Sequence, residues 1–120
     1  MNEAIKKELE ENGADVVGSI VRMARNENLY ERILLKFLSD ATYEKLKEDV
    51  AAKNYEEVFK GAHTLKGVSG NLGLNKLTDA VTIVLEKARN QTTDGIEQDM
   101  EAVTAAYDIY FNCISKLKKE

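Results

Sequence analysis

The chain contains no proline, no tryptophan, one cysteine and one histidine, and only seven of its 120 residues are glycine. Proline interrupts helices, and β-rich domains usually need many turn residues, so such a chain is expected to be almost wholly helical. Its length suits a single core and is too short for two. We therefore expect one all-α domain over residues 1–120.

The shortage of cysteine and histidine also limits the chemistry. Cys113 has no second cysteine for an internal disulfide, which favours a reducing compartment. One histidine and one cysteine are too few for the usual zinc sites, and a carboxylate-bridged di-metal bundle needs more than one histidine. No glycine-rich nucleotide motif is present. We expect neither a metal nor a nucleotide site in this chain.

Apolar runs are short, and none has the length of a membrane-spanning helix or the character of a signal peptide. We therefore expect a cytoplasmic protein that does not bind membranes. The net charge of −4 argues against non-specific nucleic-acid binding. Residues 58–78 nevertheless hold three lysines and no acidic residue, around the only histidine. We expect this basic window to receive an anion or an acidic partner surface, the alternative being a chance cluster of solvated lysines.

Apolar residues recur every three or four positions, the spacing of amphipathic helices. Residues 1–27 hold two short helices, which we expect to cover one end of the domain; the inward face of the second should carry Val16, Val17, Ile20, Val21 and Ala24. Four longer helices are expected within residues 28–118, at about 29–53 with a kink at Ser39–Asp40, 55–71, 74–90 and 95–118. Their short connections predict an up-down antiparallel four-helix bundle.

His63 lies beside the apolar stripe of the helix expected at 55–71. At 3.6 residues per turn, His63, Gly67 and Gly70 share one face, so two turns without side chains follow the imidazole. Each glycine inside a helix costs about 1 kcal/mol relative to alanine. We expect the imidazole to face solvent and the glycines to give a partner access to it. The alternative is that the glycines permit close packing, which predicts a neighbouring helix against their face.

The imidazole itself is the best candidate for chemistry. It is largely neutral at pH 7 when exposed, and its free nitrogen can attack an electrophilic phosphorus. The resulting phosphohistidine carries about two negative charges. Lys66 lies one turn along the same side, so its ammonium can reach that group. We predict that His63 accepts a phosphoryl group and that Lys66 stabilises it; the alternative is a structural histidine, which is the commoner case on bundle helices.

Histidine-containing phosphotransfer (HPt) domains carry a signature around their histidine, and the chain resembles it in the run Ala62-His63-x-Leu65-Lys66-Gly67-x-Ser69-x-x-Leu72-Gly73. The resemblance covers about residues 28–118. It implies a two-component phosphorelay in which His63 accepts a phosphoryl group from an aspartyl phosphate of one receiver domain and passes it to another. The implied partners are receiver domains of response regulators or hybrid sensor kinases. No cofactor is implied for this chain, since the receiver supplies Mg²⁺.

Three residues around the histidine are candidates for docking a partner: Phe59, Lys60 and Val68. Core packing is the alternative for Phe59. Many HPt domains use a Gln or Glu of the next helix to hold the second ring nitrogen, and the matching position falls near Leu85, which has no acceptor. Thr82 or Glu86 is expected to orient the ring instead, or else water.

Two other functions are compatible with the sequence. One is a docking bundle that binds a receiver or kinase domain without carrying phosphate, and the other is an enzyme that uses His63 as a general base. We favour a phosphoryl carrier that is not itself an enzyme. We also expect a monomer, because a closed four-helix core gives no reason for a second copy.

Overall fold

The computed structural model describes residues 1–119, and within them it is helical, without a strand. Glu120, the last residue of the predicted domain, lies outside the described residues. The helices are α1 (Glu3–Glu11), α2 (Val16–Arg22), α3 (Glu27–Phe37), α4 (Thr42–Ala51), α5 (Tyr55–Asn71), α6 (Asn75–Arg89) and α7 (Ile96–Ser115), followed by a short 3-10 helix, Lys116–Lys119. The predicted all-α class is confirmed.

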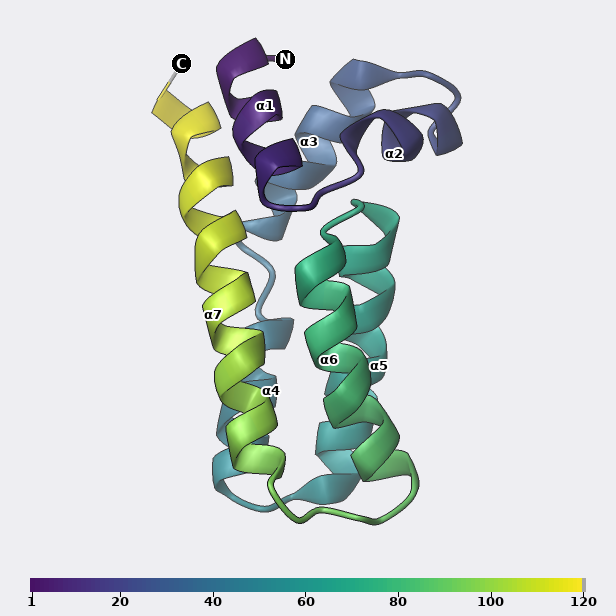
Figure 1. Ribbon diagram of the computed structural model, residues 1–120, viewed down its shortest axis with the longest axis vertical. Coiled ribbons are helices and arrows are strands. Elements are labelled where there is room, and N and C mark those ends of the chain that lie inside the picture. The colour runs from purple at the N-terminus through teal and green to yellow at the C-terminus, as the bar shows by residue number, and fades with distance from the viewer. Residues whose placement is uncertain (120) are drawn as a thin grey trace.

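Helices α4 to α7 run alternately up and down and form a four-helix bundle (Figure 1). Successive helices pack against each other, and α4 packs against α7 to close the ring. Short connections at 52–54, 72–74 and 90–95 join them. The predicted up-down antiparallel bundle is confirmed. Within residues 1–119 no helix is both long enough and apolar enough to cross a membrane.

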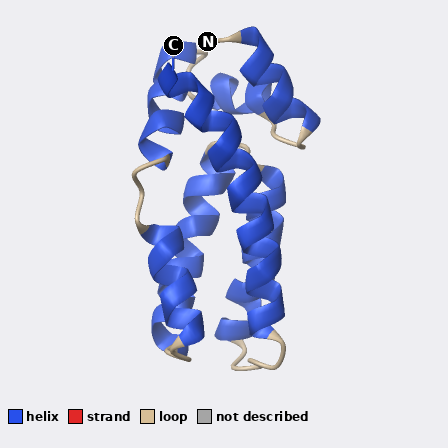
Figure 2. Ribbon diagram, turned by 90° about the vertical axis from the view of Figure 1, so that its left-hand side faces the viewer, coloured by secondary structure: helices blue, strands red, loops and turns tan. Residues whose placement is uncertain are grey.

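The helix expected at 29–53 is two helices, α3 and α4, separated by residues 38–41 (Figure 2). The kink predicted at Ser39–Asp40 is thus a complete break. The Asp40 carboxylate accepts a 2.8 Å hydrogen bond from the backbone N–H of Thr42. Such a local bond competes with helix continuation and starts the chain again in α4.

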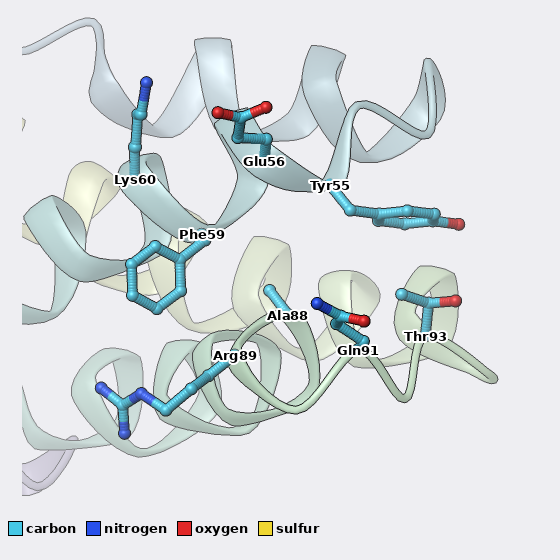
Figure 3. Close-up of a pocket in the computed structure, with 8 residues that line it drawn as sticks. All are labelled: Tyr55, Glu56, Phe59, Lys60, Ala88, Arg89, Gln91 and Thr93. Atoms are coloured by element: carbon cyan, nitrogen blue, oxygen red, sulfur yellow. The ribbon is translucent and has the colours of Figure 1, made fainter.

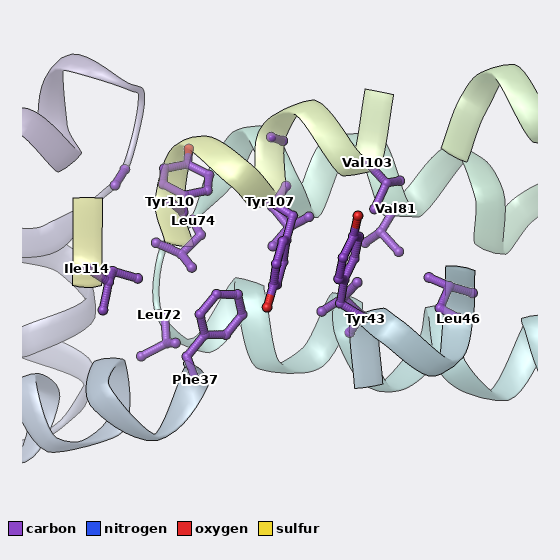
Figure 4. Close-up of a cluster of buried hydrophobic side chains, with 14 of the residues drawn as sticks. Phe37, Tyr43, Leu46, Leu72, Leu74, Val81, Val103, Tyr107, Tyr110 and Ile114 are labelled. Atoms are coloured by element: carbon purple, nitrogen blue, oxygen red, sulfur yellow. The ribbon is translucent and has the colours of Figure 1, made fainter. Parts of the chain in front are cut away.

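The bundle core is made of the apolar stripes of its helices (Figure 4). The rings of Tyr43 and Tyr107 stack with their centroids 3.7 Å apart. The ring centroid of Phe37, on α3, lies 5.5 Å from that of Tyr107. Helix α3 therefore shares this core with α4 and α7. Stacked and tilted aromatic pairs contribute beyond the area they bury, and these rings hold α3 against the bundle.

The N-terminal helices cover one end of the bundle, as Figure 1 shows. Asn2, Asp15 and Asn26 each accept a backbone N–H at the start of their helix, at 3.1, 2.9 and 3.0 Å. The predicted inward face of α2 is right for Val16, which is buried, and for Ile20, which packs against the core. It is wrong for Val17 and Val21, which are 58% and 49% exposed, and for Ala24, which is also exposed. Besides Val16, α2 buries Ser19, whose hydroxyl faces the turn between α5 and α6 at Gly73.

Candidate functional site

The site helix α5 ends in a tight turn that fixes its position. Gly73 has a φ of +71°. The N–H of Leu74 donates to the Ser69 carbonyl at 2.9 Å and that of Gly73 to the Gly70 carbonyl at 3.1 Å, the bonding pattern of a Schellman motif. A side chain at Gly73 would collide with the Ser19 hydroxyl and the Asp15 carbonyl. The turn therefore sets the α5–α6 hairpin and seats α2 against the end of α5.

His63 is exposed on α5, although the adjacent Ala62 and the nearby Leu65 are buried. A Cβ atom built at Gly67 would meet no heavy atom of the described residues within 4 Å. One built at Gly70 would lie 3.9 Å from the Thr78 methyl, which is ordinary contact. No helix packs against Gly67, in contrast to the close-packing alternative. The face that follows the imidazole is open at this position.

A shallow depression of about 380 Å³ lies beside the imidazole, between α5 and α6. It is lined by His63, Lys66, Gly67, Gly70, Asn71, Thr78, Leu85 and Arg89. Lys66 is half-buried, and its ammonium forms no ion pair with the described residues. A cation without a carboxylate partner is available to an anion that enters this depression.

The two residues expected to orient the ring have other partners. The Thr82 hydroxyl donates to the Thr78 carbonyl at 2.6 Å, and Glu86 accepts from Arg89 at 2.7 Å. Within residues 1–119 neither forms a hydrogen bond with the imidazole. Leu85 is fully buried and lines the depression with an apolar side chain. Orientation of the ring by Thr82 or Glu86 stays a prediction.

The three docking candidates lie around His63 in different environments. Phe59 is half-buried, and its ring centroid is 6.3 Å from that of the imidazole. Its ring lines a groove of about 800 Å³ between α5 and α6 (Figure 3). Lys60 is exposed and lies 3.5 Å from a Glu57 carboxylate oxygen, whereas Val68 is half-buried against the core. Phe59 and Lys60 are the candidates that a partner can reach through the groove.

The family model of the Hpt domain matches residues 32–110, about two thirds of the chain. The chain belongs to the Hpt domain family. No curated protein and no solved structure matches it. The family assignment confirms the resemblance seen around His63. Hpt domains are phosphotransfer modules of two-component systems that interact with receiver domains.

Two arginines at the site of this Hpt domain were not predicted. Arg22 of α2 donates to the Gly70 carbonyl at 3.3 Å, and Arg89 of α6 lines the depression beside His63. Arg89 adds a cation from α6 to the depression that Lys66 lines from α5, whereas Arg22 is paired with Asp15 at 3.9 Å. Arg22 is 48 positions from Gly70, so no local pattern could have placed it there. Arg89 lies one helical turn after Leu85, and this spacing was the available signal.

The single cysteine and the acidic side chains of the described residues do not line the depression. Cys113 is buried on α7, and desolvation raises the pKa of its thiol to about 11. Within the described residues, no group of three or more histidine, cysteine or acidic side chains could hold a metal ion. The depression beside His63 brings the imidazole together with Lys66 and Arg89.

Proposed function

We propose that this Hpt domain is a phosphorelay protein and that His63 carries the phosphoryl group between receiver domains. The exposure of His63 beside the open face at Gly67 is the observation that carries the proposal. An imidazole nitrogen in this position can approach an aspartyl phosphate held by another protein. A buried histidine could not do so.

The chemistry needs no nucleotide site on this chain. An imidazole nitrogen of His63 attacks the phosphorus, the bond between phosphorus and the aspartate oxygen breaks, and the aspartate leaves as a carboxylate. The proton on the other ring nitrogen is then lost to water. The reverse reaction delivers the phosphoryl group to the aspartate of a second receiver. We propose that the receiver holds the Mg²⁺ and that this chain acts as a carrier, not as an enzyme in its own right.

Lys66 is proposed to stabilise the phosphorylated state. The phosphoryl group brings about two negative charges to the rim of the depression. Lys66 lines the same depression, one turn from His63, and has no carboxylate partner within the described residues. Its ammonium can therefore meet the phosphoryl oxygens without first breaking an ion pair.

Gly67 and Gly70 are proposed to let the receiver approach. In-line attack requires the reacting atoms to come within about 3–3.5 Å of each other, so the two protein surfaces must nearly touch. Side chains at these two positions would stand between them. Phe59, Lys60 and Val68 would border the contact, and the basic residues would steer an acidic receiver surface toward it. We further propose a cytoplasmic monomer whose receivers belong to response regulators or hybrid sensor kinases.

The test is transfer of a radiolabelled phosphoryl group from phosphorylated receiver domains in the presence of Mg²⁺. We expect label on this chain that is acid-labile and base-stable, and that is absent from His63→Gln. Lys47→Ala is the control, because Lys47 is exposed on α4 and lines a separate depression with Met100 of α7. A stable complex that never acquires label would contradict the proposal and support the docking-bundle alternative.

A further inference from the structure

Arg89 contacts Glu86 and the Phe59 ring, and it lines the depression at His63. Its Nη1 donates to a Glu86 carboxylate oxygen at 2.7 Å, and its guanidinium carbon lies 5.9 Å from the Phe59 ring centroid. Its side chain lines both the groove drawn in Figure 3 and the depression beside His63. The Phe59 ring is in turn 6.3 Å from the imidazole. A rotamer change of the long arginine side chain is enough to bring it toward a group attached to His63.

We propose that Arg89 is a second cation for phosphorylated His63 and that Glu86 holds it in reserve. In the unmodified protein Arg89 pairs with Glu86; after phosphorylation it turns to the phosphoryl oxygens. The inference rests on the proposed function of His63. It adds a residue of α6 to the phosphoryl site and gives Glu86 a competing role.

We expect Arg89 to bind the phosphoryl group in preference to the Glu86 carboxylate. Arg89 and Glu86 are 48% and 44% exposed, and water screens a pair of this kind strongly. A phosphoryl group carries about two negative charges, against one on a carboxylate, and offers three acceptor oxygens. The planar guanidinium can bind two of those oxygens at once.

Among the α6 residues that line the depression, Arg89 is the one with a positive charge. Thr78 and Leu85 line it as well, but Thr78 is neutral and Leu85 is apolar. Arg89 is therefore the α6 side chain of the depression that can neutralise a phosphoryl group. Lys66 supplies the corresponding charge from α5.

The experiment uses phosphoramidate as a small phosphoryl donor, so that receiver docking plays no part. The P–N bond of phosphoramidate breaks, a bond forms between phosphorus and a ring nitrogen of His63, and ammonia leaves with the imidazole proton. The protein is then freed of donor. Phosphorus NMR gives the pKa of the phosphoryl group and the first-order rate of its loss, for wild type, Arg89→Ala, Arg89→Lys, Glu86→Gln and the control Lys47→Ala.

We expect Arg89→Ala to raise the second pKa of the phosphoryl group and to accelerate its loss about threefold to tenfold. A nearby cation lowers the proton affinity of the phosphorylated ring, and protonation of the ring precedes cleavage of the P–N bond. Glu86→Gln should shift both quantities in the opposite direction, because it frees Arg89. Arg89→Lys should fall between wild type and Arg89→Ala, and Lys47→Ala should match wild type.

Two results would overturn the inference in distinguishable ways. If His63 becomes phosphorylated but Arg89→Ala and Glu86→Gln keep wild-type pKa and rate, Arg89 is not a phosphoryl ligand, and the proposed function stands. If neither phosphoramidate nor any phosphorylated receiver modifies His63 in the wild-type protein, the proposed function fails and the inference fails with it. Circular dichroism of each variant verifies that it is folded.

Discussion

The hydroxyl of Tyr30 donates a 2.8 Å hydrogen bond to the carbonyl oxygen of Leu72, 42 positions away in the sequence. Tyr30 is fully buried on α3, and Leu72 caps the C-terminal end of α5, the helix that carries His63. Helix ends leave carbonyl groups without intrahelical partners, and a buried one must find a partner elsewhere. This bond therefore ties α3 to the end of the site helix α5.

Tyr30→Phe removes that bond and leaves the Leu72 carbonyl buried without it. We expect the free energy of unfolding to fall by about 1–2 kcal/mol, measured by urea denaturation. Tyr55→Phe is the matched control, because Tyr55 is half-buried and its hydroxyl forms no hydrogen bond within the described residues. Equal stabilities of the two variants would show that the Tyr30–Leu72 bond contributes nothing.

Alkaline pH should destabilise the fold. Burial raises the pKa of Tyr30 far above its usual value, that of Tyr107 to about 12 and that of the Cys113 thiol to about 11. The folded state therefore holds these protons more tightly than the unfolded chain. Their stabilising contribution is complete below the unfolded pKa of each group and is lost as pH rises toward the folded value.

We expect unfolding free energy to be constant near pH 8 and to fall above about pH 9 to 10, at up to about 1.4 kcal/mol per pH unit for each such group. Urea denaturation at a series of pH values measures this slope. Tyr107→Phe should reduce it above about pH 10, because one titrating group is removed. An unchanged free energy between about pH 8 and pH 11 would be incompatible with this origin.

Substitutions at Gly67 should separate stability from function. Because a Cβ there meets nothing, Gly67→Ala should stabilise the protein by up to about 1 kcal/mol through helix propensity. Transfer from a phosphorylated receiver should slow, and more so in Gly67→Gln, because the new side chain occupies the surface where the receiver must approach. Phosphorylation by the small donor phosphoramidate should be nearly unchanged. Unchanged receiver transfer in both variants would exclude the proposed access role.

Replacing the glycine at the end of α5, Gly73, by alanine should lower the free energy of unfolding. Gly73→Ala places a side chain at a φ of +71° and against Ser19 and Asp15. We expect a loss of about 2 kcal/mol or more in unfolding free energy, from backbone strain together with displacement of α2. Thermal unfolding of Gly73→Ala and Gly67→Ala, measured side by side, tests the contrast. Equal shifts in the two variants would contradict it.

Local spacing predicted the elements that depend on local chemistry. The apolar period placed α5 with His63 outside the buried stripe, and Ser39–Asp40 marked the break between α3 and α4. The apolar period was only partly right for α2, whose Val16–Ile20 and Val17–Val21 pairs both have helical spacing although only the first pair faces the core. The fit of Ser19 against the turn at Gly73 decides between those pairs, and that turn is more than fifty positions away.

The same limit applies to the site. His63, Lys66 and Gly67 lie within about one helical turn, so their common surface follows from helix geometry alone. Arg89 reaches that surface from α6, and Arg22 of α2 contacts the Gly70 carbonyl near the end of α5; both positions depend on how the helices pack. The Glu86–Arg89 pair, by contrast, is an i,i+3 contact within α6, which local spacing alone could have indicated.

Passage of the phosphoryl group through His63 is tested most directly by a chase. The protein is labelled by one phosphorylated receiver, separated from it, and mixed with a second, unlabelled receiver and Mg²⁺. The label should leave His63 and appear on the second receiver as an aspartyl phosphate, and His63→Gln should transmit none. Label that stays on this chain, or that reaches the second receiver equally well through His63→Gln, would contradict a carrier role for His63.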